Sequence, residues 1–231
     1  MIDPNNDISG PGPEPSILLF GSLALSFDST SLEQLRKTII ESDENVWLAD
    51  IIRHLSDDCE TVLLGLPALH ATGAIARRQL TDLNEAFTTG RNLDAAFPLP
   101  NTVLIPLVII NQLAQYAAFV KQSNDEKNSE NDIWAEAKGN RETLGLCTGL
   151  LSAFAASSAH SIEEFRRYGA AAVRLGMLVG LVVDNQDAVS GRGRSKSLTA
   201  AWSSAGGAEE ITGILEGFNE VGTILLDYET I

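Results

Sequence analysis

The sequence predicts an α/β fold in which short buried strands alternate with longer helices. Residues 16–20 form a short apolar run that ends at a glycine, which is typical of a buried parallel strand leading into a loop. Apolar residues then recur at helical spacing along several longer segments. A second strand is expected at residues 142–146, immediately before a glycine-rich turn and an alanine-rich helix.

The first half of the chain is expected to hold one strand followed mainly by helices. A polar, flexible leader at residues 1–15 precedes the strand. Helical patterns follow at residues 31–41, 45–56 and 69–93. A short strand is predicted at residues 62–64. Residues 102–121 indicate a long apolar helix with Pro106 in its first turn, where a missing N–H costs little.

The second half begins with a change in composition. Residues 122–136 are rich in Asp, Glu, Lys, Asn and Ser, so we expect an exposed loop or insertion there. The second strand and an alanine-rich helix at residues 150–159 come next. Ser161 then begins a helix that continues to about residue 183, with two glutamates in its first turn.

A glycine-rich break at residues 190–195 is predicted to be a domain boundary. It separates a core at residues 16–195 from a smaller unit at residues 196–231, in which residues 208–221 are expected to be helical. The division therefore predicts one large α/β domain followed by part of a second unit.

Composition and charge exclude several classes of function. The net charge is −15, whereas nucleic-acid binding needs clustered Lys and Arg. Two cysteines are too few for a disulfide framework, and neither has metal-ligand spacing. The longest apolar runs, residues 103–110 and 175–183, are less than half a membrane span. We therefore expect a cytoplasmic protein that binds neither nucleic acid nor metal and does not cross a membrane.

The turn Gly145-Leu146-Cys147-Thr148-Gly149 has the pattern of a nucleophile elbow. Flanking glycines let neighbouring elements approach closely, and the turn presents the cysteine at the start of a helix. The helix N-terminus stabilises negative charge that develops there, and the N–H of Thr148 can donate to an oxyanion. The pattern predicts acyl transfer by Cys147. A buried, inert cysteine in a glycine-rich turn is the alternative.

Residues 142–153, reading ETLGLCTGLLSA, resemble the active-site stretch of the starter-unit:acyl-carrier-protein transacylase domain of fungal non-reducing polyketide synthases. Several separate segments are similar to the same family in the same order, and the similarity covers residues 16–187 with a continuation to residue 221. These segments are residues 18–23 (LLFGSL), 45–50, 104–108 with Gln115 and Tyr116, and 171–175.

The resemblance implies a malonyl-acyltransferase-like fold, with an α/β-hydrolase-like core and an inserted ferredoxin-like subdomain that begins at residues 196–231. It also implies a two-step reaction. Cys147 would take an acyl group from coenzyme A or a fatty acid synthase carrier. The group would then pass to the phosphopantetheine thiol of an acyl carrier protein domain. Acyl-CoA is then a substrate, no cofactor is permanently bound, and the partners are carrier, polyketide synthase and fatty acid synthase domains.

The same resemblance assigns further site residues. The backbone N–H groups of Ser22 and Thr148 would form the oxyanion hole. Malonyl-type relatives hold the substrate carboxylate with an arginine in the helix after the elbow, and both Arg174 and Leu178 lie near that position. A charged substrate and a plain alkyl chain therefore both remain open.

The family pairs its cysteine with a histidine that comes after the inserted subdomain. This chain has only His54, His70 and His160, so we expect it to stop inside that subdomain without the histidine. Three interpretations follow: an incomplete starter-unit acyltransferase, a non-catalytic carrier-binding or scaffold remnant, or a cysteine hydrolase of another α/β family. A truncated product, a fragment and a degenerate homologue would all give this pattern.

Overall fold

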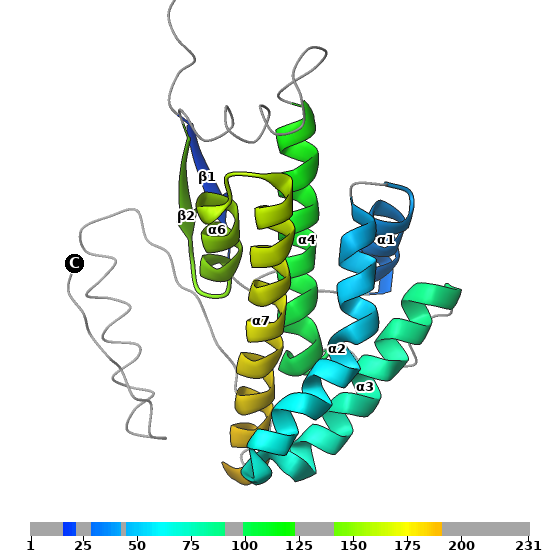
Figure 1. Cartoon of the computed structure of the whole chain (residues 1–231). Coiled ribbons are helices and arrows are strands. Elements are labelled where there is room, and N and C mark those ends of the chain that lie inside the picture. The colour runs from blue at the N-terminus through cyan, green and yellow to red at the C-terminus, as the bar shows by residue number, and fades with distance from the viewer. Residues whose placement is uncertain (1–15, 22–28, 43–44, 91–98, 123–140, 191–231) are drawn as a thin grey trace, which may run out of the picture. The chain divides into compact units, whose positions relative to one another are not determined.

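The computed structural model describes residues 16–21, 29–42, 45–90, 99–122 and 141–190, which form a pair of parallel strands and a group of packed helices (Figure 1). This arrangement is compatible with the predicted α/β class, although helices predominate. In chain order the elements are β1 Ser16–Phe20, α1 Ser29–Ile40, α2 Val46–Gly65, the short 3-10 helix η2 Pro67–Leu69, α3 His70–Thr89, α4 Asn101–Gln122, β2 Arg141–Gly145, α6 Gly149–Ser158 and α7 Ile162–Ser190.

The two strands pair in parallel, with Ser16 opposite Arg141 and Phe20 opposite Gly145. Side chains alternate between the two faces of a strand, so Leu18 and Phe20 share one face. Phe20 is buried and Leu18 packs against the core. The opposite face carries Leu19 and Leu144, which are 67% and 59% exposed. Within the described residues the helices therefore cover one face of the sheet.

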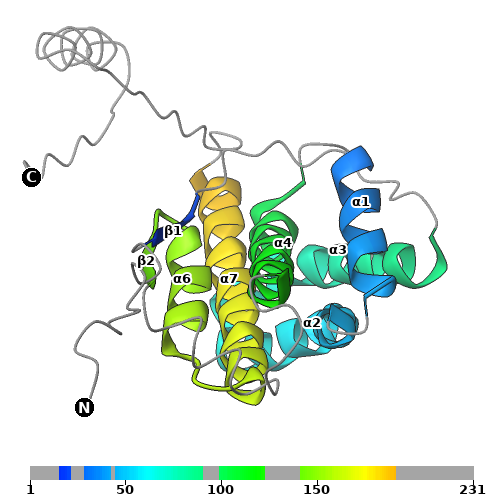
Figure 2. The same ribbon diagram turned by 90° about the horizontal axis from the view of Figure 1, so that it is seen from above.

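Helices α4 and α7 form the centre of the core, and Figure 2 shows α6, α7 and α4 side by side next to the strands. Residues 102–110 of α4 are all buried. An aromatic chain then links four elements: the ring centroids are 5.9 Å apart for Phe20 and Tyr116, 5.4 Å for Tyr116 and Phe165, and 5.6 Å for Phe165 and Trp47. These ring contacts join β1 in turn to helices α4, α7 and α2.

Helix α4 extends one residue further at each end than the helix expected at residues 102–121. By length and composition residues 101–121 could cross a membrane, but 67% of the apolar window is buried inside the fold, as is common for a core helix. Pro106 was expected in the first turn, but it is the sixth residue of α4 and lies in the second turn. A proline there leaves the carbonyl of Thr102 without its intrahelical N–H donor.

Most helices predicted from the sequence are present, but one predicted strand is wrong. Residues 62–64 belong to the last turn of α2 and do not form a strand, since the buried apolar pattern that begins at Leu48 continues through Leu55, Cys59 and Leu63. The start predicted at Ser161 is confirmed, because its Oγ accepts a hydrogen bond of 3.2 Å from the N–H of Glu164.

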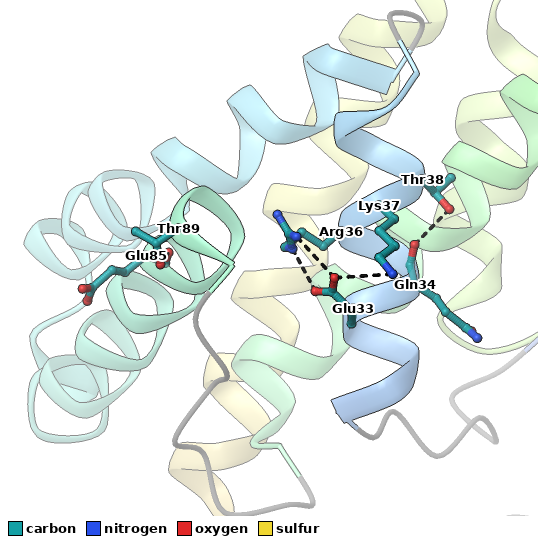
Figure 3. A network of polar contacts seen from close by, with 7 residues as sticks. All are labelled: Glu33, Gln34, Arg36, Lys37, Thr38, Glu85 and Thr89. Atoms are coloured by element: carbon teal, nitrogen blue, oxygen red, sulfur yellow. Dashed lines mark hydrogen bonds and ion pairs between the residues drawn. The ribbon is translucent and has the colours of Figure 1, made fainter.

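Helix α1 carries a surface network of polar contacts (Figure 3). Arg36 Nε donates to Glu33 Oε2 at 2.8 Å, and Lys37 Nζ lies 3.9 Å from Glu33 Oε1. The hydrogen bond from Arg36 holds the pKa of the Glu33 carboxyl below its ordinary value. Such exposed pairs add little stability. None of these residues lines the cavity described below.

Several predictions fall outside the described residues. They are the leader at residues 1–15, the smaller unit at residues 196–231 and the exposed loop predicted at residues 122–136, of which only Gln122, the last residue of α4, is described. The chain divides by its internal contacts into Met1–Gly193 and Arg194–Ile231, and only the first contains described residues. The assignment of residues 196–231 to an inserted subdomain stays a prediction.

Candidate active site at the Cys147 elbow

Cys147 lies in a sharp turn between a strand and a helix. Strand β2 ends at Gly145 and helix α6 begins at Gly149, so three residues connect them. Cys147 has a φ of +55°, and it is the one non-glycine residue with positive φ in the described part of the chain. This left-handed conformation costs a residue with a Cβ roughly 1–2 kcal/mol. A strained residue at a strand-to-helix turn is the backbone geometry of a nucleophile elbow.

The two glycines of the turn are required by close approach of the backbone. A Cβ at Gly145 would lie 2.4 Å from the Cα of Leu150, in the first turn of α6. A Cβ at Gly149 would lie 2.2 Å from the carbonyl oxygen of Phe20. Any side chain at either position would push α6 away from the strands. The glycines therefore allow the helix after Cys147 to sit directly against the end of β1.

Backbone hydrogen bonds tie the turn to β1 and close it. The N–H of Leu146 donates to the carbonyl of Phe20 at 2.9 Å, which extends the parallel pairing by one step. Within the turn, the N–H of Gly149 donates to the carbonyl of Leu146 at 3.0 Å. The N–H of Leu150 donates to the carbonyl of Cys147 at 3.0 Å. Cys147 is thus held in place by its main chain on both sides.

The two cysteines differ in accessibility. Cys147 is exposed, whereas Cys59 is fully buried in α2. Burial raises the pKa of the Cys59 thiol above its ordinary value, so this cysteine stays protonated and inert. The alternative of a buried, inert cysteine thus describes Cys59, while Cys147 is open to a substrate.

Thr148 occupies the N-cap position of α6 but does not cap it with its side chain. Its hydroxyl oxygen is buried and has no hydrogen-bond partner among the described residues. The other expected oxyanion donor, Ser22, lies outside the described residues, although Gly21 before it is described. The oxyanion-hole assignment of Ser22 and Thr148 stays a prediction.

The structure does not bring the remaining sequence-predicted candidates into the cavity beside the elbow. Arg174 Nε donates to Asp58 Oδ2 at 2.7 Å, in an exposed ion pair with α2. His54 is on the exposed side of α2, and His70 Nε2 bonds to the carbonyl of Leu63 at 2.8 Å. These residues and His160 are absent from the lining of the cavity. The substrate-binding role of Arg174 stays a prediction.

A cavity of about 540 Å³ opens beside the elbow, between the end of β1 and the second half of α4. Its wall is mainly apolar, with amide side chains from α4. The lining residues are Leu18, Leu19, Phe20, Gly21, Asn111, Gln112, Gln115, Tyr116, Phe119 and Leu146. A mostly apolar cavity with a few polar groups is a typical small-molecule site.

Two polar residues at this site were not predicted from the sequence. Gln112 Nε2 donates to the carbonyl of Gly21 at 2.8 Å, and Ser152 Oγ donates to Gln112 Oε1 at 2.6 Å. Gln112 is 8% exposed and Ser152 is fully buried. The sequence signal that could have found this pair is the amide of Gln112 within the apolar stripe of a long helix, because a buried amide needs hydrogen-bond partners.

Comparison with protein families matches residues 18–225 to a family described as "Starter unit:ACP transacylase in aflatoxin biosynthesis". The chain belongs to the starter unit:ACP transacylase (SAT) family. It is 49% identical over 220 residues to 3-methylorcinaldehyde synthase of Phoma sp, and 45% identical over 201 residues to non-reducing polyketide synthase dbaI of Emericella nidulans. These matches cover 95% and 87% of this chain but 8% of each relative.

The match to the SAT family includes Cys147, the last three residues of β1, all of β2 and the described helices from α1 to α7. The non-reducing polyketide synthase pigA of Monascus ruber is 38% identical over 205 residues, again across 8% of its length. The chain therefore spans a small part of the fungal polyketide synthases that it matches.

Proposed function

We propose that this chain is a starter-unit acyltransferase that acts with a fungal non-reducing polyketide synthase, and that Cys147 carries the acyl group as a thioester. The observation that carries the proposal is the exposed Cys147, held at φ +55° in a strand-to-helix turn of a SAT-family chain. The same reasoning favours a malonyl-acyltransferase-like core for residues 16–195.

The reaction would proceed in two balanced steps. In the first, the Cys147 sulfur attacks the carbonyl carbon of an acyl thioester, the bond to the departing sulfur breaks, and coenzyme A leaves as its thiol. In the second, the phosphopantetheine thiol of an acyl carrier protein attacks the Cys147 thioester and releases the free cysteine. The Cys147 proton goes to the departing thiol and returns from the attacking thiol, so both steps balance without a permanent cofactor.

The backbone would stabilise the negative charge that develops on the carbonyl oxygen in each step. The N–H of Thr148 is at the N-terminus of α6, where the helix dipole favours an anion. With a second N–H from Ser22 it would form an oxyanion hole, and the loss of one such donor typically costs about 100- to 1000-fold in rate.

The apolar cavity beside Leu146 supports an uncharged acyl group. The ion pair of Arg174 with Asp58 argues against a role for this arginine in holding a substrate carboxylate. The proposed partners are the acyl carrier protein domain and other synthase domains, and the proposed location is cytoplasmic.

A second candidate function is non-catalytic: the domain would bind a carrier protein or act as a scaffold without transferring an acyl group. The specific observation in its favour is that His54, His70 and His160 are all absent from the cavity beside the elbow. Without a general base, a cysteine thiol still reacts with thioesters because thiols are intrinsically nucleophilic, but more slowly.

Incubation with acetyl-CoA and hexanoyl-CoA, followed by intact-mass measurement, tests the proposal. We expect one acyl adduct on the wild type and on Cys59→Ala, and none on Cys147→Ala. Cys59 is a matched control because it is the other thiol of the chain and is buried. An adduct that survives Cys147→Ala would contradict the proposal, and carrier binding without any adduct would favour the scaffold function.

A further inference from the structure

A buried side-chain bridge joins the end of β1 to the helix that follows Cys147. Gln112 extends from α4, and its amide nitrogen donates to the carbonyl of Gly21 at 2.8 Å. Its amide oxygen accepts from Ser152 Oγ at 2.6 Å. The orientation of the amide is fixed by its partners, because the Gly21 carbonyl can only accept a hydrogen bond.

The cost of burying this amide indicates that it has a specific task. Residues on both sides of it, from Val103 to Ile110 and at Leu113, are buried and apolar. An apolar side chain at position 112 would satisfy the same packing without desolvating an amide, whose burial is unfavourable unless every polar group is paired. In this chain both ends of the amide are paired, and both partners belong to the elbow region.

The two partners of the Gln112 amide belong to the two elements that meet at the nucleophile turn, the end of β1 and the start of α6. Gly21 directly follows β1, and its carbonyl oxygen would lie 2.6 Å from a Cβ placed on Gly149. Ser152 is in the first turn of α6, five positions after Cys147. The Gln112 amide therefore connects the backbone that faces Gly149 with the helix that begins there.

Building on the proposed function, we propose that Gln112 is a positioning residue that sets the orientation of the Gly21 carbonyl against the Cys147 elbow. The Gly21 carbonyl faces Gly149, the first residue of α6, and Thr148, which directly precedes Gly149, supplies the proposed oxyanion N–H. The bridge therefore fixes the end of β1 against the helix start that carries this donor. Oxyanion donors act through their placement, so a loose carbonyl at Gly21 would slow attack on a thioester.

The test compares two reactions of the same thiol in the full chain. Acylation by hexanoyl-CoA passes through an oxyanion, whereas alkylation by iodoacetamide at a saturated carbon does not. Gln112→Met keeps the length of the side chain but removes both hydrogen bonds. We expect its acylation rate at saturating hexanoyl-CoA to fall about 10- to 100-fold, which is less than the cost of about 100- to 1000-fold for losing an oxyanion donor, because the donor is displaced and not removed. Its alkylation rate at Cys147 is expected to stay within about twofold of wild type, because alkylation uses no oxyanion donor.

Two further variants separate positioning from folding. Ser152→Ala removes the anchor of the amide but leaves its bond to Gly21, so we expect a smaller loss of acylation, with alkylation again unchanged. Asp184→Ala loosens the fold at the far end of α4 and α7, and its acylation rate is expected to match wild type at a temperature where both are folded.

The outcomes separate this inference from the proposed function. Equal acylation rates for wild type, Gln112→Met and Ser152→Ala would overturn the positioning role. Parallel losses of acylation and alkylation would also overturn it, because they would indicate only a structural role. A wild type that is alkylated at Cys147 but never acylated would instead reject the proposed acyltransferase function.

Discussion

At the scale of single residues, the account depends on the backbone of Cys147. Its positive φ is unfavourable for any residue that has a Cβ, and the surrounding hydrogen bonds hold it there. Such strain is retained where it places a side chain for chemistry. The strain is therefore measurable as a stability difference between two variants that both lack the thiol.

Cys147→Gly is expected to be more stable than Cys147→Ala by about 1 kcal/mol, because glycine adopts positive φ without strain whereas alanine does not. This order is the reverse of the usual one, in which alanine is the more stable residue. Urea unfolding of the two variants gives the difference directly. An alanine variant more stable than the glycine variant, which is the usual order, would mean that position 147 carries no strain.

The sequence predicted the residues of the turn, but it did not predict the buried side chains that hold the turn in place. The glycines at 145 and 149 are a local signal, because the backbone approaches that require them come from the turn itself and the adjacent β1. Gln112 and Ser152 could not be predicted in the same way, since the bridge joins residues 40 and 91 positions apart in the chain. Only the three-dimensional arrangement shows which groups the amide in this apolar helix binds.

At the scale of elements, the contact between α6 and β1 is decisive for the site. Helix α6 lies so close to the carbonyl of Phe20 that position 149 has no room for a methyl group. Its start also follows Cys147 directly, so a displaced helix would move the nucleophile.

Gly149→Ala is expected to destabilise the protein by about 1–3 kcal/mol, because the added methyl group must displace backbone. Gly65→Ala is the matched control, since a Cβ there meets nothing within 4 Å at the end of α2. We expect the control to be neutral or slightly stabilising by about 0.5 kcal/mol. Thermal unfolding compares the two, and equal midpoints would contradict the close approach.

One carboxylate of α7 binds the first residues of α4. Asp184 of α7 accepts hydrogen bonds from the backbone N–H groups of Asn101 and Thr102, at 3.0 and 2.8 Å, and from both of their side chains. It thereby satisfies donors at the N-terminus of α4 that have no partner within the helix.

Asp184→Ala is expected to cost about 1–3 kcal/mol of unfolding free energy, because it removes the partner of these partly buried donors. Asp82→Ala, on the exposed side of α3, serves as the control and should change stability by less than about 0.5 kcal/mol. Chemical denaturation of both variants measures the effect. A neutral Asp184→Ala would show that water replaces the carboxylate at no cost.

Element boundaries were predicted where local chemistry marks them and missed where it does not. The start of α7 was predicted from Ser161, whose hydroxyl caps the helix. The end of α2 was not, because residues 62–64 look like a short strand before Pro67, whereas Leu63 continues the buried stripe of the helix. Tertiary burial therefore overrides local propensity there.

At the scale of the whole molecule, the fold class followed from the alternation of short and long apolar segments. The strand expected at residues 62–64 was wrong, because a strand and the end of a helix look alike over three residues. The described sheet has two strands, and Leu19 and Leu144 on its open face are more than half exposed. A parallel sheet is usually covered on both faces.

The proposed function requires that an acyl group pass through Cys147 to a carrier. The measurement isolates the protein acylated by hexanoyl-CoA, adds an acyl carrier protein bearing phosphopantetheine, and follows both masses with time. We expect the adduct to leave Cys147 and to appear on the carrier in equal amount. An adduct that persists on Cys147, or a carrier acylated equally well in the presence of Cys147→Ala, would contradict the proposed function.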